Sequence, residues 1–453
     1  MNRRTAIRSL FGASSLLPAV LSDLSAATSS ANPLAPRAPH FPSKAKRVIF
    51  LYLTGGASHV DSFDYKPKLI ADHGKTVTGV RNAKGHLYAP KWEFQARGQS
   101  GLMISDLFPH IASCADDLCL IRSMRNDHND HFEATLGIHT GSITFARPSF
   151  GAWVSYGLGT ENQNLPSFVV LAPELPYAGG QNWSSDFLPG CHQGTRIVPG
   201  SEPIPNMHRR AASPELQQLE LGLLDFFNKR HQGPRSDDPV LAARIKSFET
   251  AYGMQMEAPD LFDLSREPDS ILNMYGLERG STKGFAWQCL VARRMAERGV
   301  RFIELIDTGA SRNWDAHGDI DTHGPLAKNV DQPVAALLKD LKARGMLDET
   351  LVVFTTEFGR TPYRGDEKNK GREHHCYAFS SWIAGAGTKP GTSYGESDDY
   401  GITVAKDEVH LHDFHATLLH LLGFEHTRLT FRHGGRDYRL TDIAGKVIPG
   451  LVA

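Results

Sequence analysis

The sequence is short of the features that define several large classes of protein. It contains only 5 cysteines in 453 residues, and no two of them form a Cys-x-x-Cys pair, which argues against a zinc site built from thiolates. Its 49 basic and 50 acidic residues give a net charge of −1, so it lacks the basic excess with which nucleic-acid binders neutralise phosphates. We therefore expect no nucleic-acid partner.

The chain also lacks an apolar run of the roughly 20 residues that a membrane-spanning helix needs. The run Leu10–Leu21 is too short, but it lies within an export signal that we predict over residues 1–27. The adjacent Arg3-Arg4 indicates the twin-arginine pathway, with an ordinary secretory signal as the alternative. We predict an exported protein, periplasmic or extracellular, in which residues 28–45 form a linker and no segment of the mature chain spans a membrane.

The rest of the sequence has the pattern of a layered α/β fold. Apolar, β-rich runs recur, and segments with helical spacing separate most of them, which is typical of a mostly parallel central sheet flanked by helices. We predict strands over Val48–Thr54, Leu118–Ile121, Phe168–Leu171, Arg301–Ile306, Leu351–Thr355 and Ala378–Ala384. We predict helices over Asp106–Cys114, Phe132–His139, Glu215–Arg230, Pro239–Tyr252, Phe285–Arg298, Val330–Arg344 and His412–Leu422.

One part of the chain departs from this alternation. Residues 200–280 contain two polar helical segments and few strand signals, so we interpret them as a helical insertion. No internal repeat divides the remainder. We therefore predict a single α/β domain over residues 46–453, with the insertion around 200–280.

Histidine is the residue that the sequence has in plenty. The chain contains 21 histidines, and 11 of them lie in four short stretches, at 128–139, 317–323, 374–375 and 410–420. Several of these stretches lie next to predicted strand ends, where the reactive groups of parallel sheets collect. Because imidazole and carboxylate groups bind zinc, manganese and iron, the clustering indicates a metal centre at one rim of the sheet.

Five strand-end loops and the start of the last helix supply candidate ligands for this centre. Each place has an ordinary structural reading as well, since Asp, Ser and His also cap helices and close turns, so the prediction rests on the whole set. The candidate metal ligands are Asp61, His131, Asp315, His317, Glu357, His374 and His412. Arg360, which follows the strand that ends near Glu357, could instead hold an anionic substrate.

The order of the motifs along the chain adds a second argument. The motifs are Gly55-Gly56 with Asp61 and Phe63-Asp64, His131 leading to Thr140-Gly141, Trp314-Asp315-Ala316-His317, Glu357-Phe-Gly-Arg-Thr-Pro362, Gly371-Arg-Glu-His374, Ala384-Gly-Ala-Gly387 and His412-Asp-Phe-His-Ala-Thr417. As a set they resemble the domain-of-unknown-function 1501 family, exported bacterial proteins placed in the alkaline phosphatase and sulfatase superfamily. The resemblance covers nearly the whole mature chain.

The resemblance implies an alkaline phosphatase/sulfatase-like fold that holds one or two divalent ions, zinc, manganese or calcium, for hydrolysis of sulfate or phosphate esters. It also exposes a departure. Sulfatases carry a Cys or Ser ten residues before the glycine of a Thr-Gly ending, and that place is His131 here, with no Cys-x-Pro-x-Arg motif anywhere. A formylglycine mechanism is therefore not expected, and Ser58 and Thr135 are the nearby hydroxyls.

Our hypothesis is an exported metal-dependent hydrolase in which a metal-activated water attacks an anionic ester, such as that of a sulfated glycan. Arg360 or Arg372 would stabilise the anionic oxygens, and His128, His375 or His412 would be the general acid. The missing nucleophile motivates an alternative, a non-catalytic metal-bearing protein that binds anionic surface glycans. A third possibility is a structural envelope protein whose histidines satisfy a polar core.

Overall fold

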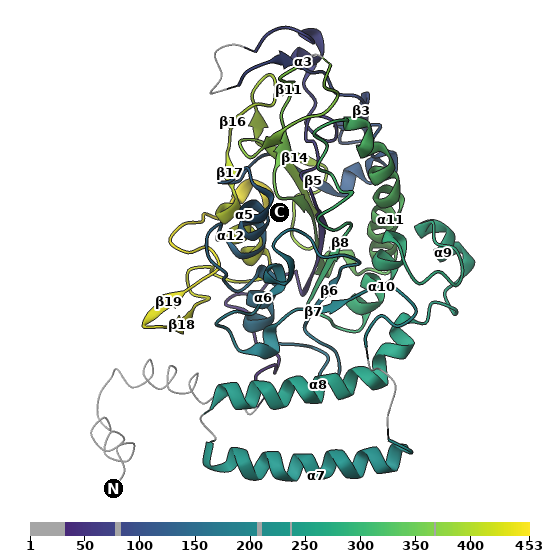
Figure 1. Ribbon diagram of the computed structural model, residues 1–453, viewed down its shortest axis with the longest axis vertical. Helices are drawn as coiled ribbons and strands as arrows, with labels where there is room; N and C mark the ends of the chain where they lie inside the picture. The colour runs from purple at the N-terminus through teal and green to yellow at the C-terminus, as the bar shows by residue number, and fades with distance from the viewer. Residues whose placement is uncertain (1–31, 78–82, 206–210, 236–237, 367) are drawn as a thin grey trace.

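A nine-stranded sheet forms the centre of the computed structural model, which describes residues 32–77, 83–205, 211–235, 238–366 and 368–453 (Figure 1). The neighbouring strands follow the order β14-β5-β13-β9-β1-β8-β6-β7, and β17 also pairs with β5. The strands are β1 (Arg47–Leu53), β5 (Leu118–Arg125), β6 (Phe168–Leu171), β7 (Thr195–Ile197), β8 (Phe302–Ile306), β9 (Thr350–Thr356), β13 (Phe379–Ala384), β14 (Thr392–Tyr394) and β17 (Val409–His410).

The direction of these strands decides which loops meet. Every neighbouring pair in the sheet is parallel except the two that involve β13, which runs against both β5 and β9. The segment that precedes β13 therefore arrives at the edge where β1, β5, β8 and β9 end. The predicted α/β class with a mostly parallel central sheet is confirmed.

Helices cover both faces of this sheet (Figure 1). The side chains of β1 show why, because alternate residues of a strand point to opposite faces and both sets here are apolar. Ile49, Leu51 and Leu53 face one core, which also contains residues of α4 (Pro109–Ala112), α9 (Asp269–Tyr275), α10 (Phe285–Glu297) and α11 (His323–Ala343). The opposite core contains residues of α5 (His131–Thr140), α6 (Phe150–Leu158) and α12 (Leu411–Leu421).

Most of the predicted elements are present, with shifted ends. The helix predicted over Asp106–Cys114 shortens to α4, since Pro109 lacks an amide hydrogen and stands at its first position. The helix predicted from Val330 begins earlier, at His323, and accommodates Pro333 inside it. The helices α6 and α9 and the short strands β7, β14 and β17 were not predicted.

The predicted insertion around 200–280 contains three helices among its described residues. These are α7 (Pro214–Gln232), α8 (Pro239–Phe262) and α9. Figure 1 shows α7 beneath α8, on the side of α8 away from the sheet. The exact limits of the domain and of this insertion stay predictions.

The N-terminal predictions meet the structure only in part. The export signal predicted over residues 1–27 lies outside the described residues. Of the predicted linker, residues 32–45 contain no helix or strand, but Leu34 is buried and the amide of Arg37 donates to the carbonyl of Leu158 at 2.9 Å. Among the described helices, none is long and apolar enough to cross a membrane. In the described part of the chain, no disulfide bond joins any two of the five cysteines.

Short two-stranded ribbons and one short helix complete the edges of the fold. One ribbon, β10 with β12, lies directly before β13 and brings the histidine pair at 374–375 to the rim of the sheet. The remaining elements are α3 (Pro67–Ala71), β2 (His86–Leu87) with β11 (Tyr363–Arg364), β3 (Phe94–Arg97) with β4 (Leu102–Ser105), β10 (Gly359–Arg360) with β12 (His374–His375), β15 (Glu396–Ser397) with β16 (Val404–Lys406), and β18 (Phe431–His433) with β19 (Arg436–Tyr438).

Candidate metal centre

Four potential metal ligands converge at the edge where the parallel strands end. His131 is the first residue of α5, Asp315 and His317 lie in the loop after β8, and His374 lies in β12. Donor atoms of His131, Asp315 and His374 all lie within 4.8 Å of one another. The Nε2 of His317 joins them at 2.9 Å from Asp315 Oδ1 and 2.9 Å from the Nε2 of His374. We call these four residues the His–Asp cluster.

Each of the three imidazole rings is fixed through its Nδ1. The Nδ1 partners are Glu357 Oε1 for His131 at 2.7 Å, Glu373 Oε2 for His317 at 2.6 Å and the backbone carbonyl of Asn129 for His374 at 2.6 Å. Carboxylates and backbone carbonyls accept hydrogen bonds, so each Nδ1 carries the hydrogen. Each neutral ring therefore presents the lone pair of its Nε2 to the centre of the cluster.

The chemistry of this arrangement fits a divalent cation. The Nε2 of His131 is buried without a hydrogen-bond partner and lies 3.4 Å from Asp315 Oδ2. The Nε2 atoms of His317 and His374, only 2.9 Å apart, face each other with lone pairs that repel unless a proton or a metal ion lies between them. Three imidazole nitrogens and a carboxylate are a donor set that suits zinc, and also manganese or iron.

Glu357 orients the cluster from behind. Its carboxylate is fully buried at the end of β9, and Oε1 accepts from the Gly55 amide at 2.8 Å as well as from His131. The other oxygen, Oε2, accepts from the hydroxyls of Tyr52 at 2.8 Å and Thr356 at 3.0 Å. Burial alone would raise the pKa of Glu357, but the hydrogen bonds that it accepts, first of all the one from His131, outweigh burial and lower the pKa. Such a carboxylate behind a histidine fixes the ring for metal binding.

Asp315 carries the negative charge on the open side of the cluster. Its Oδ1 accepts from Arg360 at 2.6 Å. Burial alone would raise the pKa of Asp315, but the contacts with His131 and His374 and the charge of Arg360 hold it well below its usual range. Asp315 is 25% exposed and His317 is 43% exposed, so molecules from solvent can reach this side.

Aromatic rings hold His131 and His374 in place. The ring of Tyr177 stacks on His131 with 4.2 Å between centroids, and the ring of Phe358 lies 4.9 Å from His131 and 4.8 Å from His374. Burial alone would lower the pKa of His131, but the carboxylates of Asp315 and Glu357 outweigh it and raise the pKa. The cluster is thus rigid on its buried side.

Asp61, a predicted ligand, does not join the cluster. It is fully buried, and its oxygens accept from Arg372 at 2.7 and 3.3 Å, from the Ser58 hydroxyl at 2.5 Å and from the Lys91 amide at 2.8 Å. These partners use both oxygens. The structure therefore places Asp61 in a closed ion pair rather than beside the four ligands.

The two predicted anion-binding arginines already form ion pairs and hydrogen bonds within the protein. Arg372 donates to Asp61 and to the backbone carbonyls of Tyr88, Ala89 and Thr361. Arg360 donates to Asp315 and to the backbone carbonyls of Gly55, Gly56 and Arg372. Both guanidinium groups are buried, so the structure does not present them to a substrate.

The other predicted histidines also lie outside the cluster. The Nε2 of His375 is 2.6 Å from the Ile402 carbonyl, and that of His412 is 2.8 Å from the Gly141 carbonyl, at the far end of α5. Ten helical residues span about 15 Å, so His412 is remote from His131. His128 lies in the loop before α5, where its Nδ1 accepts from the Asp130 amide at 3.1 Å.

The two nearby hydroxyls are buried and bonded. Ser58 donates to Asp61, and Thr135 lies 2.9 Å from the hydroxyl of Tyr52. Both side chains are inaccessible, with 0% of each residue exposed. Neither can attack a substrate from its position in this structure.

Sequence reasoning missed the residues that hold the rings. Glu373 neighbours His374 in the sequence, and Asn129 lies inside the polar run before His131, so proximity to the predicted ligands was an available signal for both. Tyr52 lies in the apolar run of β1, and Tyr177 lies in a loop with no motif. Nothing in the sequence distinguishes these two tyrosines from ordinary core or surface residues.

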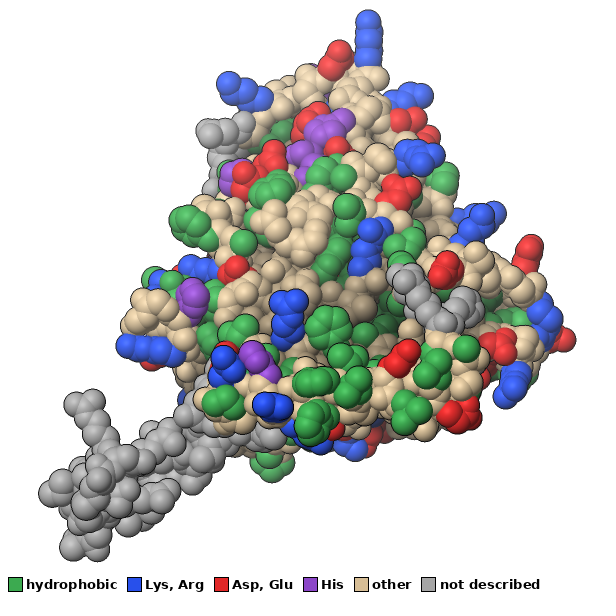
Figure 2. Space-filling model, turned by 60° about the horizontal axis from the view of Figure 1, so that its bottom comes forward, with side chains coloured by type: hydrophobic (Ala, Val, Ile, Leu, Met, Phe, Trp, Pro, Cys, Tyr) green, Lys and Arg blue, Asp and Glu red, His purple; other side chains and the backbone are tan. Residues whose placement is uncertain are grey.

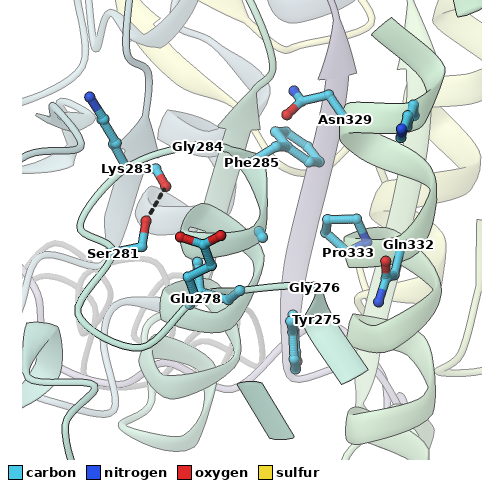
Figure 3. Close-up of a pocket in the computed structure, with 13 residues that line it drawn as sticks. Tyr275, Gly276, Glu278, Ser281, Lys283, Gly284, Phe285, Asn329, Gln332 and Pro333 are labelled. Carbon is cyan, nitrogen blue, oxygen red and sulfur yellow. Dashed lines mark hydrogen bonds between the residues drawn. The ribbon is translucent and has the colours of Figure 1, made fainter. Parts of the chain in front are cut away.

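A separate pocket lies away from the cluster. It has a volume of about 320 Å³, and its lining includes Glu278, Ser281, Lys283, Asn329 and Gln332, around the start of α10 (Figure 3). Ser281 donates to the backbone carbonyl of Lys283 at 3.2 Å. None of the four cluster residues lines this pocket.

The fold and the site together define an α/β protein with a His–Asp cluster at the carboxyl ends of its parallel strands. The chain belongs to the family described as proteins of unknown function DUF1501, whose family model matches residues 45–452. The predicted family resemblance is confirmed. No curated protein matches the sequence.

Solved structures with a related shape include sulfatases and phosphatases. The lipoteichoic acid synthase LtaP from Listeria monocytogenes has 8% identity and a TM-score of 0.40, with 89% of this chain and 78% of that chain covered. The PsFucS1 sulfatase from Pseudoalteromonas sp. has 13% identity and a TM-score of 0.34, over 84% and 69% of the chains. The phosphonate monoester hydrolase SpPMH from Silicibacter pomeroyi has 12% identity and a TM-score of 0.33, over 84% and 74%. Similarity this low carries no argument about activity.

Proposed function

We propose that this protein is a metal-dependent hydrolase of sulfate or phosphate esters that holds one divalent ion in the His–Asp cluster. The observation that carries the proposal is the convergence of three Nε2 atoms on one partly exposed carboxylate, each ring being locked through its Nδ1. A divalent ion bound there supplies Lewis acidity, which polarises an ester oxygen and acidifies water.

The residues of the cluster differ in solvent exposure, and we assign their roles accordingly. His131, buried and held by Glu357, orients the inner side of the site. Asp315 and His317, which are partly exposed, leave the outer side open, as catalytic metal sites require for a substrate. With Arg360 and Arg372 committed, the negative charge of an ester would be met at the ion itself.

His128 is the predicted residue that remains available as a proton donor. Its side chain is 43% exposed, and because its Nδ1 accepts a hydrogen bond, the hydrogen of the neutral ring lies on Nε2. It precedes Asn129, whose carbonyl accepts from His374. This placement supports a role in protonating the leaving alcohol.

The test is ester cleavage by the purified full-length protein. We expect 4-nitrophenyl sulfate or 4-nitrophenyl phosphate to be cleaved, with activity lost on chelation and regained with zinc or manganese. His317→Ala should abolish cleavage, whereas His412→Ala, a histidine at the far end of α5, should retain it. Cleavage that survives chelation, or that His412→Ala and His317→Ala reduce equally, would contradict the proposal.

A second function is a metal-bearing protein that binds anionic surface glycans without cleaving them. The buried, bonded state of Ser58 and Thr135 favours it, because no hydroxyl of that pair can act as a nucleophile. Binding of a sulfated polysaccharide that depends on the metal, with no cleavage of either ester, would select this function. Export is part of both proposals, and N-terminal sequencing of the secreted form, with processing near residue 27, tests it.

A further inference from the structure

The helix α7 exposes more large apolar side chains than any other helix among the described residues. Its 19 residues include none that is buried. Six of the fifteen large apolar side chains exposed in the described chain belong to it, and three more belong to α8. Figure 2, in which the bottom of the molecule comes forward, shows apolar side chains along the lower edge, where Figure 1 places these two helices. An apolar patch of this kind marks an interaction site.

The helix α7 has two faces with different surroundings. Gln217, Leu221 and Asn228 are half-buried, and Gln217 donates to Gln255 of α8 at 3.0 Å, so this face meets α8. The opposite face presents Leu216, Leu219, Leu223 and Phe226, which are 43%, 72%, 58% and 58% exposed. We call these four residues the α7 seam.

The spacing of the α7 seam is that of a helix that packs on another helix. The steps of 3, 4 and 3 residues match the alternating positions of a heptad, which line a contact between two helices. Gly222 adds to this, since it lies in the middle of α7 and a Cβ placed there would meet nothing within 4 Å. A glycine inside a helix costs about 1 kcal/mol relative to alanine, and close approach of a partner helix is a reason to have one.

The charges of α7 indicate which helix fits. Its first part carries Glu215 and Glu220, and its last part carries Lys229 and Arg230. When two copies of α7 lie antiparallel with their seams in contact, Leu216 faces Phe226 and Leu219 faces Leu223 of the second copy. The acidic first part of one helix then lies beside the basic last part of the other, in which Lys229 also bonds Asp225 of its own helix at 2.7 Å. The acidic residues of the first part disfavour an anionic lipid surface instead.

We propose that a second copy of this chain packs on the α7 seam, with the two α7 helices antiparallel. At roughly 100 Å² for each of the four side chains of the α7 seam, the contact would bury about 400 Å² of apolar surface per copy. A standard interface buries about 800 Å² per partner, of which about 450 Å² is apolar. The seam therefore supplies about as much apolar area as a standard interface contains.

Sedimentation velocity of the full-length protein tests the pairing. We expect a mass of two chains for the parent and of one chain for Leu219→Lys/Phe226→Lys, with an unchanged circular dichroism spectrum that shows the variant is folded. Ile443→Lys, in a loop where the apolar side chain is 85% exposed, is the matched control and should remain paired. A parent that sediments as one chain, or a double variant that remains paired, overturns the proposal.

A charge exchange tests the antiparallel arrangement. Glu215→Lys and Arg230→Glu should each weaken pairing, and the two together should pair more tightly than either alone. A combined variant that pairs more weakly than both single variants overturns the antiparallel register. A monomeric parent that binds vesicles of zwitterionic lipid through Leu219 and Phe226 overturns the self-pairing in favour of a membrane.

Discussion

The His–Asp cluster and the Asp61–Arg372 pair are built from similar residues and end in opposite states. Both lie beside strands of the same sheet, and both join charged groups from distant parts of the chain. Around Asp61, two oxygens meet donors from Arg372, Ser58 and Lys91, so nothing is left to bind. In the cluster, the supporting bonds end at the Nδ1 atoms, and the Nε2 atoms face inward without donors.

This difference teaches how a metal centre is distinguished from a buried polar network. The residue types do not distinguish the two sites, because each contains a carboxylate next to an arginine side chain. The two sites differ in which polar atoms have hydrogen-bond partners. A closed network stabilises the fold, whereas a set of oriented and unsatisfied lone pairs is prepared for a cation.

Breaking the closed pair should have the largest effect on stability. We expect Arg372→Met to lower the free energy of unfolding by about 3–5 kcal/mol, because Asp61 stays buried without its partner. Urea denaturation measures this, with Lys68→Met as the control, since the Lys68–Asp399 pair is exposed to solvent and should contribute far less to stability. Metal content should stay at the parental level, and its loss in Arg372→Met would move Asp61 into the metal centre.

The buried His415 contrasts with the histidines of the His–Asp cluster. His415 donates through Nε2 to the Ile138 carbonyl, while its buried Nδ1 has no hydrogen-bond partner among the described residues. Burial lowers the pKa of His415 from 6.5 to about 3. Below pH 6.5 His415 is protonated in the unfolded chain but stays neutral in the folded chain. The free energy of unfolding is therefore unaffected by His415 above pH 6.5 and decreases as the pH falls towards 3.

The prediction for His415 is a difference in slope. Between pH 6.5 and about pH 4.5 the histidine should cost the parent about 2–3 kcal/mol, and His415→Gln should remove that part of the decrease. Urea denaturation at several pH values measures it, with the exposed His433→Gln as the control that keeps the parental slope. Equal slopes for the parent and His415→Gln would contradict the assignment.

Two buried glutamates allow a matched test of the support behind the cluster. Glu357 lies 2.7 Å from His131, and Glu304 lies 2.8 Å from His139, both pairs being buried. We expect Glu357→Gln to weaken metal affinity about 10- to 100-fold, because the ring of His131 loses its charged partner. Glu304→Gln should leave affinity unchanged when both are measured by competition with a chelator. Equal losses would mean that the effect is one of stability.

The exposed support should matter least. Glu373 holds the Nδ1 of His317 at 2.6 Å, but its side chain is 56% exposed and solvent screens the pair. We expect Glu373→Gln to weaken metal affinity by less than about tenfold. A larger loss than that of Glu357→Gln, in the same chelator competition, would reverse the order of the two supports.

Much of the fold followed from the sequence because the parallel strands are buried on both faces. All seven residues of β1 are buried, and this continuous apolar run was the signal that predicted it. The helix α6 was missed because eight of its nine residues are buried, so it has no polar face to mark it as a helix. Strands of two or three residues, such as β14 and β17, are too short to carry a pattern.

The site was predictable in its residues but not in its contacts. His131, Asp315, His317 and His374 were all among the candidates, because each lies beside a strand end. Glu357 was also a candidate ligand. Its position behind His131 could not be predicted, because it depends on where the donors of Tyr52, Gly55, His131 and Thr356 lie in space. Likewise, nothing local to Asp61 reveals Arg372, which is 311 residues away along the chain.

The most direct test of the account is elemental analysis of the natively exported protein beside Asp315→Ala/His317→Ala. The account predicts one divalent ion per chain in the native protein and almost none in the double variant, with both remaining folded by circular dichroism. A native protein without metal, or a double variant that keeps its metal, would contradict the assignment of the His–Asp cluster.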